Sequence, residues 1–299
     1  MKSRAFSRRV AVLAAVVGLS STTAFADPIT ITSFTTADAL AQLLVDTSSG
    51  ITIVPGSATY TGATVAAGSF SGDGGILPFD SGVVLTSGLA SLVPGPNNND
   101  GAGFANHTPS NAQLNSLTAP TVMHGDASVL AFSFIPNTSS LSIQFVFGSD
   151  EYNEFVGTPF NDVFGFFLNN VNIALVPGTT LPITVNNVNS GTNSQYFTNN
   201  PVIQGGTGGI QYDGLVGASV SLFAQGTVIP NAVNTIVLGI EDSGQVRGQP
   251  DLLIDSGVLL KAHSFQLDDV PPPTVPEPGT IVLVASGAAF AARRRMRRS

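Results

Sequence analysis

Large apolar residues alternate with small or polar ones through the middle of the chain, and this period of two limits the possible folds more than any other feature. One run contains Leu130, Phe132 and Phe134, and a second follows the turn PNTSS and ends at Phe147. Because successive side chains on a strand point to opposite faces, each run predicts a strand with one face fit for burial. Their closeness in sequence predicts a β-hairpin.

A second hairpin is predicted immediately downstream. Phe164, Phe166 and Leu168 alternate, Asn169-Asn170 is a turn signal, and the chain returns through 173–175. Similar short apolar runs predict further strands at 181–185, 216–223, 235–240 and 257–262.

Turn residues are frequent throughout, with 32 Gly and 19 Pro, whereas only 10% of residues are charged. One helix is predicted where Thr35 or Thr36 precedes Leu40, Leu43 and Leu44, ending before Ser48. Residues 94–120 lack apolar periodicity and predict a long surface loop, either flexible or offering oxygens to a cation. Since strands do not alternate with helices, the sequence predicts a mainly β protein: a jelly-roll-like β-sandwich with one or two short helices and long loops.

The charges are strongly partitioned. All nineteen acidic residues lie between Asp27 and Glu277, where the only basic residues are Arg247 and Lys261; the other nine Lys and Arg are in the two tails. Such an acidic body repels nucleic acid and attracts divalent cations or basic partners, or simply stays soluble. The chain has no cysteine, which excludes thiol catalysis and cysteine-based metal sites.

Residues 1–26 have the pattern of a secretory signal peptide. A basic start precedes an apolar run at 10–19, and Ala24-Phe25-Ala26 is a small-residue cleavage site that would leave Asp27 first. The apolar run is about half the roughly 20 residues that a membrane span needs, so cleavage after export by the Sec machinery is favoured over a permanent helix.

The densest acidic cluster follows the second strand and suggests calcium. Carboxylate and amide oxygens of this kind bind calcium when loops gather six to eight of them. The candidate ligands are Asp150, Glu151, Asp162, Asp242 and Asp255, with Glu154 and Asp251 nearby. The other interpretation is that these carboxylates cap turns or stay solvated.

Catalysis has little support in the sequence, which predicts a protein that is not an enzyme. Asp150 or Glu151 with Asp162 is a nominal acid-base pair for a secreted carbohydrate-active hydrolase, the alternative function. However, the chain has no Trp to stack on a sugar, and the three histidines, at 107, 124 and 263, lack metal-ligand or triad spacing.

Long ordered motifs give a family resemblance. The segments FGSDEYNEFVGTPFNDVFGFFLNN, FDSGVVLTSGLA, YDGL and DSGVLLKAHSF resemble the bacterial choice-of-anchor L family over roughly 36–267. The resemblance implies one exported domain, assigned here to 27–267, whose relatives carry different attachment signals. It implies no known activity.

The C-terminus resembles a PEP-CTERM sorting signal over 276–299. Pro276, Glu277 and Pro278 follow a proline-rich linker at 268–275 and precede an apolar stretch and an arginine cluster. The resemblance implies recognition and processing by an exosortase in a Gram-negative bacterium, with only transient membrane contact; a retained short anchor is the alternative. The expected location is the cell envelope, biofilm matrix or medium, with exopolysaccharide or other surface proteins as further candidate partners and a structural or adhesive role.

Overall fold

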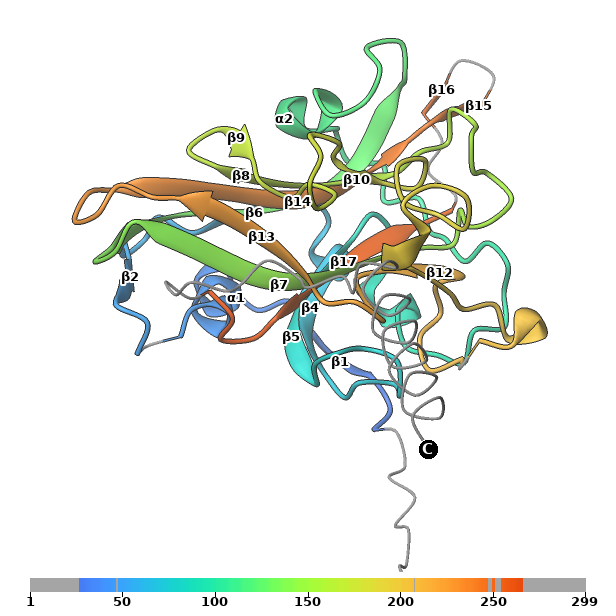
Figure 1. Ribbon diagram of the computed structural model, residues 1–299, viewed down its shortest axis with the longest axis horizontal. Coiled ribbons are helices and arrows are strands. Elements are labelled where there is room, and N and C mark those ends of the chain that lie inside the picture. The colour runs from blue at the N-terminus through green and yellow to red at the C-terminus, as the bar shows by residue number, and fades with distance from the viewer. Residues whose placement is uncertain (1–26, 47, 207, 247–248, 251–253, 266–299) are drawn as a thin grey trace, which may run out of the picture.

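The computed structural model describes residues 27–265 except 47, 207, 247–248 and 251–253. Two antiparallel sheets lie face to face (Figure 1), which confirms the predicted mainly β sandwich. In spatial order, the larger sheet contains β1 (Thr30–Ser33), β4 (Ala67–Ser71), β5 (Ser81–Thr86), β17 (Ser256–Lys261), β7 (Ser140–Ser149), β12 (Gly214–Val216) and β11 (Phe197–Asn199), with β13 (Leu222–Thr227) also pairing with β7.

The smaller sheet packs over it. Its order is β10 (Ile183–Thr184), β8 (Val163–Leu168), β14 (Asn234–Ser243), β6 (His124–Pro136) and β2 (Ile51–Ile53), with β3 (Thr59–Thr61) also on β6 and β9 (Val171–Asn172) also on β8. A separate ribbon pairs β15 (Gln245–Val246) with β16 (Gln249–Pro250).

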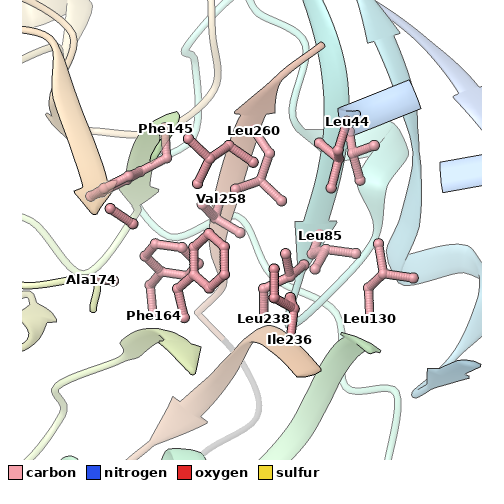
Figure 2. Close-up of a cluster of buried hydrophobic side chains, with 14 of the residues drawn as sticks. Leu44, Leu85, Leu130, Phe145, Phe164, Ala174, Ile236, Leu238, Val258 and Leu260 are labelled. Carbon is pink, nitrogen blue, oxygen red and sulfur yellow. The ribbon is translucent and has the colours of Figure 1, made fainter. Parts of the chain in front are cut away.

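Aromatic and aliphatic side chains from both sheets fill the space between them (Figure 2). Phe145 on β7 and Phe164 on β8 are fully buried, and their ring centroids are 5.0 Å apart across the two layers. The alternation that predicted each strand therefore identifies its inward face correctly.

The first predicted hairpin is wrong in its pairing although both strands exist. β6 pairs with β14, β2 and β3, whereas β7 pairs with β17, β12 and β13 in the other sheet. The connection at 137–139 carries the chain from one sheet to the other. Alternation shows which face of a strand is buried but not which strand lies beside it, because two apolar faces can pack against each other across the sandwich.

The second hairpin is confirmed in its turn, although its returning strand is β9 at Val171–Asn172 and does not extend through 173–175. Leu168 on β8 is opposite Val171, and the two turn residues have φ of 49° at Asn169 and 68° at Asn170. Two consecutive residues with positive φ are typical of a type I′ turn, and asparagine tolerates this conformation better than most residues.

The other local predictions hold in part. β14 and β17 confirm the strands at 235–240 and 257–262, while only Ile183–Thr184 is a strand within 181–185. The strand predicted at 216–223 is wrong, because β12 ends at Val216 and β13 begins at Leu222, with Gly217 at φ +92° between them.

The predicted helix is confirmed as α1 (Ala37–Leu44), and the Thr36 side chain caps it by accepting a hydrogen bond from the Ala39 backbone amide. Leu44 is fully buried, and α1 packs against β5 and β6, which belong to different sheets. The helix therefore closes one side of the sandwich. No helix within the described ranges combines the length and the apolar content needed to cross a membrane.

The long loop at 94–120 folds back onto the sheets. A short helix, α2 (Ala112–Asn115), is capped by Asn111 and places Leu114 against Val129 and Phe167 on the outer face of the smaller sheet. Single 3-10 turns lie at Thr64–Ala66, Ala90–Leu92, Ser194–Tyr196 and Val202–Gln204. The predicted signal peptide (1–26), linker (268–275) and sorting tail (276–299) lie outside the described residues.

A buried carboxylate cluster as the candidate functional site

Acidic side chains from distant parts of the chain meet at one end of the sandwich. In the larger sheet, the end of β7 lies beside the start of β17, because Ser149 is paired with Ser256. In the smaller sheet, the end of β14 lies beside the start of β8, because Glu241 is paired with Val163. The antiparallel topology therefore brings together Asp150, Glu151, Asp162, Asp242 and Asp255, the five residues predicted from the sequence. Each is at most 4% exposed.

Asp162 connects the two sheets. Its Oδ1 accepts a hydrogen bond from the Ser243 backbone amide (2.8 Å), and its Oδ2 accepts one from the Ser256 hydroxyl (2.7 Å). Its own amide donates to Glu151 Oε2 (3.0 Å), while the Glu151 amide donates to the Ser149 hydroxyl (2.9 Å). These two acids are therefore part of the hydrogen-bonding structure that holds the end of the sandwich together.

Asp150 belongs to a second group that also contains Asp213. The Asp213 amide donates to Asp150 Oδ1 (3.1 Å), the Asp150 amide donates to the Asp255 carbonyl (3.2 Å), and Asn97 Nδ2 donates to Asp213 Oδ1 (2.8 Å). Burial, reinforced by the charge of Asp213, raises the pKa of Asp150 to about 9. Burial raises the pKa of Asp213 to about 6.

Asp242 and Asp255 are the least satisfied pair. Asp255 Oδ2 accepts from the Phe104 amide (2.9 Å), but Asp255 Oδ1 and both carboxylate oxygens of Asp242 are buried without a hydrogen-bond partner. Burial, followed by the charge of Asp162, raises the pKa of Asp255 to about 8 and that of Asp242 well above its ordinary value. The Ser87 hydroxyl lies near enough to Asp242 to act against this rise in its pKa, without the geometry of a hydrogen bond.

Two further acids have partners of their own and were not predicted as site residues. Asp126 sits at φ 48° beside the bulge in β14, and its oxygens accept from the amides of Asn106 (2.7 Å) and Thr108 (2.6 Å). Glu241 accepts from the Asn111 amide (2.9 Å) and lies 3.2 Å from His124 Nδ1.

Asp213 was also missed, although it stands in the YDGL motif. The long loop supplies most of the donors to these acids, and its lack of periodicity hid that role.

Of the other residues predicted near the site, Glu154 is exposed, and Asp251 lies outside the described residues. Asn97, in the Asn-Asp-Gly run, is buried and donates to Asp213.

In the part of the chain that the structure describes, no three acidic or histidine side chains are placed so that together they could hold a metal ion.

Among the described residues, the space beside Asp150 and Asp255 is about 10 Å³, too small for a sugar. A larger cavity of about 470 Å³ is lined by Thr118, Thr158, Asn186 and their neighbours, without an acidic side chain. The nominal pair of Glu151 and Asp162 is therefore engaged inside the protein.

A known protein family matches the sequence of the whole described domain. The model of the choice-of-anchor L domain matches residues 29–266, which include both sheets and all the acids described above. The chain belongs to the choice-of-anchor L family. A PEP-CTERM protein-sorting motif matches residues 274–298 of this choice-of-anchor L protein. No curated protein and no solved structure matches the chain.

The two matches establish where the protein goes. The sorting motif marks an exported protein of the cell envelope or extracellular space that is processed by an exosortase. Proteins of these two families are typically non-catalytic surface proteins.

Proposed function

We propose that the folded domain is a structural or adhesive component of the biofilm matrix or cell envelope, and that it acts without catalysis. The observation that carries this proposal is the burial of the acidic residues that a hydrolase would use. Asp150, Glu151 and Asp162 are 1–3% exposed and are held by hydrogen bonds to backbone and serine groups. A general acid must reach the oxygen of the scissile bond, which side chains so enclosed cannot do.

The surface of the domain supports a binding or structural role. The described residues contain fifteen of the nineteen acids, and Lys261 is the single lysine or arginine among them, so this part of the domain presents little positive charge. Partners with basic groups, or acidic polymers bridged by divalent cations, fit such a surface better than nucleic acid or anionic lipid.

The proposal is tested in a bacterium that possesses an exosortase. The full-length chain is compared with a variant in which Pro276, Glu277 and Pro278 are all replaced by Ala, and the protein in membrane, matrix and medium is measured by immunoblot and intact mass. We expect the variant to keep its C-terminal tail, to be lost from the matrix and to reduce biofilm mass as strongly as deletion of the gene.

A matched control replaces Pro271, Pro272 and Pro273 in the linker by Ala, which leaves the sorting motif unchanged. Normal biofilm mass after deletion of the gene would contradict the structural role. Turnover of a matrix polysaccharide by the wild type that disappears in a folded Asp162→Asn variant would instead establish the hydrolase.

A further inference from the structure

Three buried carboxylate oxygens in the described part of the chain lack any hydrogen-bond partner, and all belong to Asp242 and Asp255. These side chains are 2% and 4% exposed. Removing an ionised carboxylate from water without a partner costs several kcal/mol, so some group must neutralise this pair in the folded protein.

Among the described residues, no basic side chain is placed to do so. Lys261 is the only lysine or arginine among the described residues, and it lies at the opposite end of β17 from Asp255. His124, the nearest histidine along the sheet, is engaged with Glu241 at 3.2 Å. Within the described part of the chain, a proton and a bound cation are the remaining candidates.

The surroundings of the pair favour a cation that prefers oxygen. The Ser87 hydroxyl lies beside Asp242, and Gly88 leaves room for the Asp255 carboxylate, since a Cβ at position 88 would overlap its oxygens. Asp162 adds negative potential to both residues while its own oxygens bond to Ser243 and Ser256. Two carboxylates balance the charge of a divalent ion, and calcium completes its shell with neutral oxygens and water.

We propose that Asp242 and Asp255 bind one calcium ion between the two sheets, and that this ion stabilises the domain after export. The set is narrower than the five carboxylates expected from the sequence. Asp150 and Glu151 instead hold backbone and neighbouring groups, and Asp162 positions the strands around the site. This proposal concerns stability and does not depend on the role of the domain at the cell surface.

The test uses protein recovered after export of the full-length chain. The protein is stripped with EDTA, and its Tm and the binding of ⁴⁵Ca by equilibrium dialysis are measured against added calcium at constant ionic strength. We expect saturable binding of one ion and a rise in Tm of about 5–10 °C at a hundredfold excess over Kd. Magnesium should give a much smaller rise, because it demands a stricter geometry.

Two variants separate a bound ion from a bound proton. Asparagine resembles a protonated aspartate in shape, so Asp242→Asn and Asp255→Asn should each fold and lose calcium binding together with the calcium-dependent rise in Tm. The matched control is Glu241→Gln, which should lower Tm but keep the calcium response, because Glu241 is paired with His124.

Absence of ⁴⁵Ca binding to the wild type would overturn the proposal. A calcium response that persists in Asp242→Asn and Asp255→Asn would also overturn it, as would an equal response to magnesium for the assignment to calcium.

Discussion

Tyr152 provides a sharp test of how the acidic loop is fixed to the core. The side chain is fully buried, its hydroxyl donates to the Val188 carbonyl at 2.7 Å, and its ring centroid is 4.8 Å from that of Phe197. Burial raises the pKa of Tyr152 well above its ordinary value, so the hydroxyl remains a protonated donor. This hydrogen bond links the loop after β7 to a residue 36 positions away, beside the bonds that Asn186 makes to Asn161 and Thr158.

Tyr152→Phe removes the donor and keeps the ring. Val188 is itself fully buried, so its carbonyl is left without this partner, and an unsatisfied buried polar group costs about 1–3 kcal/mol. In a domain of this size, each kcal/mol corresponds to a fall in Tm of about 2–4 °C, so a loss near 2 kcal/mol predicts a fall of about 4–8 °C. Urea unfolding monitored by circular dichroism gives the free energy, and an unchanged m-value confirms that the native state is preserved.

Tyr212→Phe is the matched control. Tyr212 is also buried on the larger sheet, but its hydroxyl donates to Thr86 Oγ1 at 3.4 Å, a long and weak hydrogen bond. We expect this variant to lose less than about 1 kcal/mol. If Tyr152→Phe changed the free energy of unfolding by no more than the control does, the argument that its hydrogen bond fixes the loop would be refuted.

Two further predictions follow from close packing and from a buried phenol. At Gly148 on β7, a Cβ would overlap the Tyr212 ring and lie 2.9 Å from Leu215 Cδ2, so Gly148→Ala should cost about 1–3 kcal/mol. Gly191→Ala is its control, because a Cβ there meets only Asn189 Oδ1 at 3.5 Å, and an equal loss in both variants would contradict the packing argument. Burial raises the pKa of Tyr60 to about 12, so the folded state favours the protonated phenol, and this stabilisation holds below about pH 10 and is lost as the pH rises toward 12. Urea titrations at pH 9 and 11.5 should therefore show a steeper loss in the wild type than in Tyr60→Phe, and parallel losses would refute the assignment.

Local sequence patterns predicted the individual strands and turns of this fold better than they predicted which strands pair with each other. The alternation at Leu130, Phe132 and Phe134 identified a strand and its buried face, and Asn169-Asn170 identified a turn, because both signals depend on residues close in sequence. The pairing of β6 with β14 depends on residues about a hundred positions apart, so the sequence pattern carries no signal for it. For this reason, the hairpin predicted between β6 and β7 is wrong.

The same distinction applies to the carboxylate cluster. Asp150, Glu151 and Asp162 stood out because they are close in sequence, and Asp242 and Asp255 because they flank predicted strands. Asp126 and Asp213 also precede predicted strands, but each becomes part of the cluster only when its strand pairs across the sheet, and neither was predicted as a site residue. Sequence also could not tell which carboxylates would have donors, because the donors come from the backbone of the long loop.

The buried acids differ in how their charge is balanced, and this difference separates a binding site from a structural one. Backbone amides satisfy Asp126, a serine hydroxyl and an amide satisfy Asp162, and His124 faces Glu241. Such acids stabilise the fold through the hydrogen bonds they accept, and a cation would have to displace those bonds to reach them. Asp242 and Asp255 have oxygens that nothing in the described structure occupies, so a cation can bind them without that cost. The calcium hypothesis therefore follows from the unequal distribution of donors within the cluster, and the number of acidic residues alone would not support it.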